Sequence, residues 1–194
     1  MRVVFCSSEV VPFVKTGGLA DVAGSLPIEL EKLGQEIVII LPGFKQAGQA
    51  GVTIKKLNHN YSLAKIGKNI KVYFVENKDF YHRHSLYGDK NGDYPDNLER
   101  FTFYCRQALA LLKEIDFSAQ LIHCHDWQAS LIPVYLKTLY AQDKFFKKTA
   151  SLLTIHNIGY QGIFDADQFP QLGLADELFS IDGLEYYGRI NILK

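Results

Sequence analysis

The sequence predicts an α/β protein built on a doubly wound, mainly parallel sheet. Short apolar, β-branched runs alternate along the chain with segments whose apolar residues have helical spacing. The connections between these runs have the usual length of strand–helix–strand crossovers. With 194 residues, 47% of them apolar, the chain can bury a core without disulfides or metals. We therefore expect a single domain over residues 1–194.

The first part of the chain predicts a strand, a helix and three further strands. Apolar residues from Leu19 to Leu33 recur at helical spacing, and Gly34 is placed to end that helix. Pro27 lies inside the pattern and lacks a backbone donor, so we expect a kink or break near residues 24–26. Strands are expected at residues 2–6, 36–41, 52–57 and 70–75, with a turn around residues 65–69 able to pair the last two.

Residues 78–95 predict a long polar loop, which is more often functional than idle inside a compact domain. Asp96 and Glu99 then have the spacing of a capping box at the start of a helix that we expect to reach residue 115. Strands at residues 121–124 and 152–155, a helix at 129–140 and a final stretch from residue 165 that is helical in pieces complete the expected order.

The charges and cysteines narrow the class of protein. The 21 basic residues balance 21 acidic ones, so the chain offers no broad attraction to nucleic acid or to an anionic membrane. No apolar run approaches the roughly 20 residues of a membrane span, and the opening residues predict a strand rather than a signal segment. Cys6, Cys105 and Cys124 lie in apolar stretches and predict buried, reduced thiols. We therefore expect a soluble cytoplasmic protein.

Polar segments follow three of the predicted strands. Open α/β sheets bind their ligands beyond the carboxyl ends of the strands. The residues placed there are Lys15, Gly17 and Gly18 after the first strand, His125 and Asp126 after strand 121–124, and His156 and Asn157 after strand 152–155. We expect these three segments to share one pocket.

The turn after the first strand suits an anion. Gly17 and Gly18 allow a ligand to approach the backbone closely, next to the free N–H groups of a helix start. Lys15 adds a mobile positive charge suited to a phosphate oxygen. The alternative is an ordinary strand–helix turn with a solvated lysine. The sequence has neither GxxxxGK[ST] nor GxGxxG here, which argues against an ATPase or a dinucleotide-binding protein.

The histidines leave several interpretations open. His123 and His125 share one face of their strand and, with His156 as a third ligand, could hold the metal ion of a hydrolase. Alternatively, one histidine is bonded in the core while Asp126 caps the following helix, or Asp126 binds a substrate hydroxyl. His156 and Asn157 could polarise a substrate or cap the backbone.

Four segments together resemble the glycogen/starch synthase family. Residues 15–27, which read KTGGLADVAGSLP, match the family's Lys-Thr-Gly-Gly-Leu signature. Residues 86–101, 123–127 and 154–162 are similar to three further family blocks. Gln128-Ala129-Ser130 stands where the family often has His-Ala-Gly.

The resemblance implies the Rossmann-like, acceptor-side N-terminal half of a GT-B glycosyltransferase that needs neither metal nor cofactor. Such an enzyme transfers glucose from ADP-glucose to the non-reducing-end 4-hydroxyl of an α-1,4-glucan, with retention at the anomeric carbon. The resemblance assigns catalytic roles to His156 and Asp126, and substrate-binding roles to Lys15, Gly17, Gly18, Asp21, Tyr94 and Asn157. A C-terminal domain absent from this sequence would supply most adenine contacts, so we expect little transfer by this chain alone. The alternative is a non-catalytic carbohydrate-binding module that uses the Tyr81–Tyr94 loop and Asp126.

Overall fold

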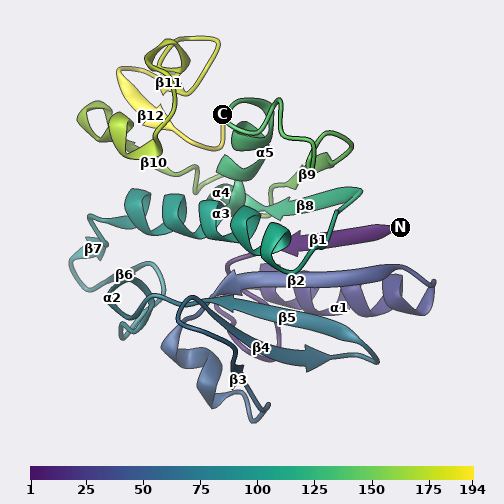
Figure 1. Cartoon of the computed structure of the whole chain (residues 1–194). Helices are drawn as coiled ribbons and strands as arrows, with labels where there is room; N and C mark the ends of the chain where they lie inside the picture. Colours follow the sequence, from purple (N-terminus) through teal and green to yellow (C-terminus); the bar gives the residue numbers. More distant parts are fainter.

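A seven-stranded sheet runs through the centre of the molecule in the computed structural model, which describes all 194 residues (Figure 1). In spatial order its strands are β3 (Lys55–Lys56), β4 (Tyr61–Ile66), β5 (Ile70–Val75), β2 (Glu36–Pro42), β1 (Arg2–Cys6), β8 (Leu121–His125) and β9 (Ala150–Thr154). The five strands from β5 to β9 are parallel, whereas β4 and β3 are antiparallel to their neighbours. This arrangement confirms the predicted α/β class with its mainly parallel sheet.

Helices cover both faces of the sheet. Helix α1 (Gly18–Lys32) lies on one face, and α3 (Asn97–Glu114) with α5 (Leu131–Lys137) lies on the other (Figure 1). Two opposite faces follow from right-handed crossovers that run in opposite directions across the sheet, from β1 to β2 through α1 and from β5 to β8 through α3. The apolar sides of the strands and helices form one continuous core.

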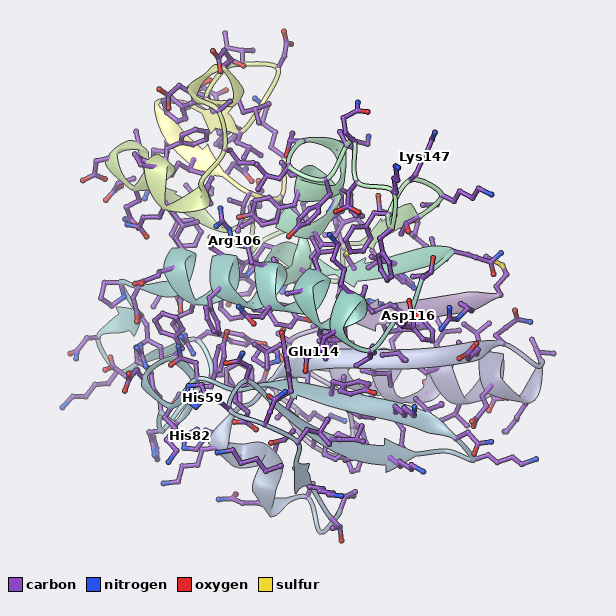
Figure 2. All side chains as sticks on the ribbon, viewed as in Figure 1. His59, His82, Arg106, Glu114, Asp116 and Lys147 are labelled. Carbon is purple, nitrogen blue, oxygen red and sulfur yellow. The ribbon has the colours of Figure 1, made fainter.

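Shorter elements complete the chain. They are η1 (Lys45–Gln49), α2 (Lys78–Tyr81), β6 (Gly88–Asp89), β7 (Gly92–Asp93), α4 (Asp126–Ala129), β10 (Ile163–Asp165), η2 (Ala166–Leu172), η3 (Asp176–Leu178), β11 (Glu185–Tyr186) and β12 (Arg189–Asn191). Strands β10, β12 and β11 form a small antiparallel sheet at the end of the chain. Arg106 of α3, labelled in Figure 2, donates to the carbonyl oxygen of Leu172 at 2.8 Å and so ties η2 to the main domain.

The order of the strands places the site. The chain moves from β1 toward β2 and β5 on one side, then returns to add β8 and β9 on the other. The order therefore reverses between β1 and β8, which pair directly in parallel. The carboxyl ends of two strands that diverge in this way leave a crevice between their loops.

Several expected elements of the first half differ in the structure. Helix α1 runs from residue 18 to 32 without a break, although Pro27 lies inside it. Pro27 is buried with Ala20 and Ala23, so burial against the sheet compensates for one missing hydrogen bond. The expected strand at 52–57 shrinks to β3, and the partner of β5 in the hairpin is β4, which the sequence did not predict. Small buried side chains at Ser62 and Ala64 hide the alternation of β4.

The second half contains further differences. Asp96 stands at the N-cap of α3 but makes no capping bond, because its carboxylate accepts from Arg83 Nη1 at 2.8 Å. The predicted capping box is therefore wrong, although the helix itself is confirmed. The helix expected at 129–140 is two short helices, α4 and α5, that begin at Asp126. Strand β9 begins two residues and ends one residue earlier than expected, and the last stretch adds three strands to its helical turns. No helix of the structure has both the length and the apolar character required to span a membrane.

Candidate functional site

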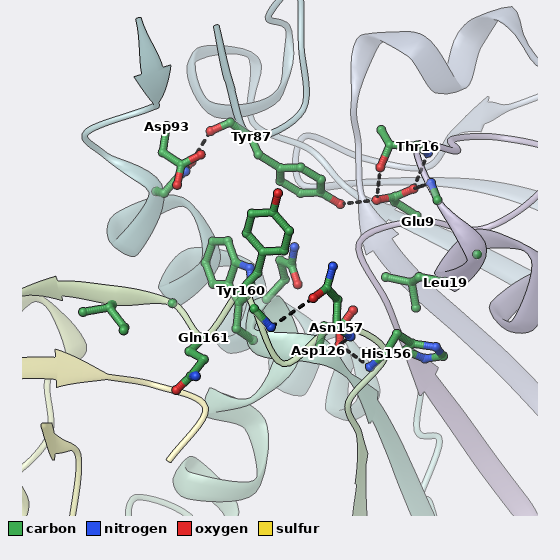
Figure 3. A pocket seen from close by; sticks show the side chains of 18 of the residues that line it. Glu9, Thr16, Leu19, Tyr87, Asp93, Asp126, His156, Asn157, Tyr160 and Gln161 are labelled. Carbon is green, nitrogen blue, oxygen red and sulfur yellow. Dashed lines mark hydrogen bonds between the residues drawn. The ribbon is translucent and has the colours of Figure 1, made fainter.

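A cleft of about 770 Å³ opens at the carboxyl ends of β1, β8 and β9 (Figure 3). Its lining includes Gly17 and Gly18 after β1, Asp126 after β8, and His156 and Asn157 after β9. The expectation that these three segments share one pocket is therefore confirmed. The crevice lies where the strand order reverses, as the topology requires.

The glycine turn leaves open space and unused donors on its cleft side. A Cβ atom added to Gly17 or Gly18 would meet no other atom within 4 Å. Gly17 is the N-cap of α1 and provides no side-chain cap. The backbone N–H groups of Gly18 and Leu19 have no protein acceptor. The helix start therefore keeps two donors and its positive dipole end available to a ligand.

Glu9 braces this turn from behind. Its Oε1 atom accepts from Thr16 Oγ1 at 2.6 Å and from the Tyr87 hydroxyl at 2.8 Å, and its Oε2 atom accepts from the N–H groups of Thr16 and Gly17 (Figure 3). These four donors fill the lone-pair positions of a carboxylate. Burial raises the pKa of Tyr87 well above its ordinary value, so its hydroxyl stays protonated and continues to donate. Glu9 therefore stabilises the shape of the turn. It also occupies the N–H groups of Thr16 and Gly17, which are then not available to an anion.

Lys15 and Asp21 pair with each other beside the cleft. Lys15 Nζ donates to both carboxylate oxygens of Asp21, at 2.7 and 2.8 Å. Their side chains are 53% and 56% exposed, so the pair contributes little to stability. Neither residue lines the cleft in this arrangement. The predicted roles of both residues toward a ligand remain predictions.

Asp126 connects two strand ends. Its Oδ1 atom accepts from the N–H of His156 at 2.6 Å and from that of Asn157 at 3.4 Å (Figure 3). It does not cap its own helix, as one of the sequence interpretations proposed, but instead caps the loop after β9. Its backbone has φ of 55°, a left-handed conformation at the point where β8 turns into α4. The buried carboxylate thereby holds the β9 loop against β8 with one oxygen.

The three histidines contact one another directly. The His123 and His125 ring centroids lie 4.1 Å apart, and His125 Nδ1 lies 2.9 Å from His156 Nε2. His123 Nε2 bonds instead to Thr154 Oγ1 at 2.7 Å. No group of three or more His, Cys, Asp or Glu side chains in the structure is arranged to hold a metal ion. The geometry therefore gives the metal-hydrolase interpretation no ligand set.

Tyr94 lies on the far side of the 78–95 loop, outside the cleft lining. The guanidinium groups of Arg83 and Arg100 lie 4.8 and 5.1 Å from its ring centroid. Arg100 is fully buried and donates to the carbonyl oxygens of Phe80 and Leu86, at 2.9 and 2.8 Å. The loop is therefore anchored from beneath, and Tyr94 belongs to that anchor in this structure. Its predicted contact with a sugar stays a prediction.

The sequence interpretation missed several residues of the cleft. The principal additions are Glu9, Tyr87, Asn97, Tyr160 and Gln161, all of which line it. Glu9 lies in the segment between β1 and α1, so the same rule about strand ends could have identified it. Asn97 begins α3 and donates to the Tyr87 carbonyl oxygen at 2.8 Å, a contact that no sequence spacing reveals.

The chain is similar to known proteins in both structure and sequence. A solved structure of the catalytic domain of starch synthase IV from Arabidopsis thaliana, bound to ADP and acarbose, superimposes with a TM-score of 0.80 at 26% identity, covering 99% of this chain and 42% of that one. Glycogen synthase 2 of Geobacter metallireducens is 44% identical, and glycogen synthase of Thermotoga maritima is 42% identical, each over the whole chain. The chain spans about 43% of the length of these two relatives.

The mixed α/β architecture matches the GT-B glycosyltransferase fold of that plant domain. Over residues 2–194 the sequence matches the family described as the starch synthase catalytic domain. The chain belongs to this family of glycogen and starch synthases, as the resemblance of its four segments implied.

Proposed function

We propose that residues 1–194 form the acceptor-side, N-terminal domain of an enzyme that transfers glucose from ADP-glucose to the 4-hydroxyl at the non-reducing end of an α-1,4-glucan. The observation that carries this proposal is the single cleft that joins an open glycine turn to Asp126, His156 and Asn157. A solved relative that binds ADP and acarbose supports the same pairing of nucleotide and oligosaccharide.

The glycine turn is suited to the leaving group. Cleavage of the anomeric bond places negative charge on the departing diphosphate, and donors fixed in advance stabilise that charge without reorganisation. The free N–H groups of Gly18 and Leu19 would serve as those donors. Lys15 would add a cation after exchanging Asp21 for a phosphate oxygen, which costs little because the existing pair is exposed.

The opposite wall is suited to a sugar. Asp126 has one carboxylate oxygen, Oδ2, with no protein donor, and His156 and Asn157 offer further polar atoms beside it. These groups would orient the hydroxyls of the transferred glucose and of the acceptor. Trp127, Tyr160 and Phe164 add apolar surface against which a sugar ring can pack.

Incorporation of radiolabelled glucose from ADP-glucose into glycogen tests the proposal. We expect strong incorporation by the complete protein and little by this chain alone, because the relatives are more than twice as long. A folded complete protein that incorporates no glucose would refute the activity.

A second candidate is a carbohydrate-binding module without catalysis, favoured only by the sugar-binding character of this wall. Calorimetry with maltooligosaccharides and with ADP-glucose separates the two functions. A module would bind the glucan and ignore ADP-glucose.

A further inference from the structure

His125 is a fully buried polar residue beside the cleft. It is 0% exposed at the end of β8, and Phe5 stacks on it with ring centroids 5.6 Å apart and planes at 17°. His156 stacks at 5.2 Å and 27°, and its Nε2 atom lies 2.9 Å from His125 Nδ1. The His125 ring is therefore held by packing, and it presents one nitrogen to a residue of the cleft wall.

The two remaining nitrogens of this pair differ in their surroundings. His125 Nε2 is buried and has no hydrogen-bond partner. His156 Nδ1 has no protein partner either, but it is accessible to solvent, and His156 lines the cleft. Burial, reinforced by the charges of His123 and His156, lowers the pKa of His125 to about 3. His125 therefore carries a single ring proton at neutral pH.

One proton joins the two rings. A hydrogen bond between His125 Nδ1 and His156 Nε2 requires that one of these atoms carry a proton and that the other lack it. If His125 holds its proton on Nδ1, a neutral His156 must hold its own on Nδ1 and offers a donor to the cleft. If His125 holds its proton on Nε2, His156 must use Nε2 as well and offers an acceptor. Two neutral rings joined by this hydrogen bond therefore share one tautomer.

We propose that His125 is a positioning residue that fixes both the ring orientation and the tautomer of His156. Whether His156 donates to or accepts from a ligand at Nδ1 is then decided by a buried ring that no ligand touches. The coupling of the rings stands on their contact and on the single ring proton that burial leaves on His125. Its use toward a sugar hydroxyl, as part of glucose transfer, rests on the proposed function.

Nitrogen-15 NMR of the histidine rings in the ligand-free chain at pH 7.5 tests the coupling, because long-range ring correlations identify each tautomer. We expect His125 and His156 to show the same tautomer. Two different tautomers in this pair would overturn the proposal.

Two variants sharpen the test. His125→Asn keeps a side-chain amide near the position of Nδ1, and we expect His156 to remain in a single tautomer. His125→Phe keeps the ring packing but removes the hydrogen bond, and we expect the His156 nitrogens to shift to averaged values. An unchanged His156 spectrum in His125→Phe would also overturn the proposal. If that variant fails to fold, the wild-type chain and His125→Asn still decide the question.

Glucose transfer by the complete protein then tests whether catalysis depends on the coupling between His125 and His156. We expect His125→Phe to lower kcat about tenfold or more with a smaller effect on KM, and His125→Asn to restore part of kcat. A complete wild-type protein that shows coupled rings but no transfer would refute the proposed function and leave the positioning role intact. Coupled rings with an unchanged kcat in His125→Phe would refute the catalytic use of the coupling.

Discussion

Alanine at Gly17 or Gly18 should affect the stability of the protein and its binding of ligand differently. Gly17 has extended backbone angles (φ −149°, ψ −166°) and Gly18 is the first residue of α1, so alanine fits both conformations. The added methyl group would meet no protein atom within 4 Å at either position. Alanine at Gly18 also restricts the unfolded chain, which stabilises a protein by about 0.4–1 kcal/mol at compatible sites. At Gly17 this gain is offset, because Gly17 is the N-cap of α1 and alanine is a poorer N-cap than glycine. We therefore expect Gly18→Ala to raise Tm by about 1–4 °C.

Ligand binding should change in the opposite direction. The space that accepts the new methyl group is the space that the proposed diphosphate occupies against the N–H groups of Gly18 and Leu19. Forcing a methyl group into a close contact typically costs about 1–3 kcal/mol. That cost corresponds to roughly 5- to 150-fold weaker use of ADP-glucose.

Thermal unfolding and glucose transfer by the complete protein, measured on the same preparations, check both halves of this prediction. Gly48→Ala is the matched control, because Gly48 is exposed on η1 and also has no atom within 4 Å of an added Cβ. It should stabilise to a similar degree and leave transfer unchanged. The reasoning is refuted if Gly18→Ala transfers glucose normally, or if it unfolds well before the wild-type protein.

Four further outcomes are expected. Lys15→Ala should change stability by less than about 1 kcal/mol because its ion pair is exposed, yet reduce transfer, and Asp21→Asn shows whether Asp21 itself is needed in the same assay. Asp126→Asn keeps an acceptor for His156 N–H and tolerates φ of 55°, so in urea it should be more stable than Asp126→Ala by about 1–2 kcal/mol; equal midpoints would contradict this. Burial lowers the pKa of His125 from 6.5 to about 3, so only the unfolded chain gains this proton between those values. Stability should be full above pH 6.5 and fall toward pH 3 by up to about 1.4 kcal/mol per unit, with a shallower fall in His125→Phe. The three cysteines are buried, and the pKa of Cys6 is raised to about 12, so a thiol-specific disulfide reagent should label none of them before unfolding.

The sequence predicted β1, β2, β5 and β8 well because these strands are almost wholly buried and read as continuous apolar runs. It failed where the elements are too short or too mixed to show a period. Strand β4 buries Ser62 and Ala64 rather than large apolar residues, and β11 has only two residues. Asp96 had the sequence of a helix cap, but the nearby Arg83 competes more strongly for its carboxylate.

For the site, the rule about strand ends was enough to bring together Gly17, Asp126 and His156. It could not predict which polar groups would already be occupied within the protein. Glu9 takes the N–H groups of Thr16 and Gly17, and Asp21 takes Lys15. These partnerships depend on side chains that meet only after folding, and no spacing along the chain encodes them.

The left-handed backbone at Asp126 restricts which substitutions this position can accept. A side chain there must tolerate positive φ and also supply an oxygen to the amide of His156. Glycine meets only the first requirement, and glutamate meets the second at the wrong reach and with greater strain. Asparagine satisfies both, so the backbone and the loop contact together admit very few side chains at this position.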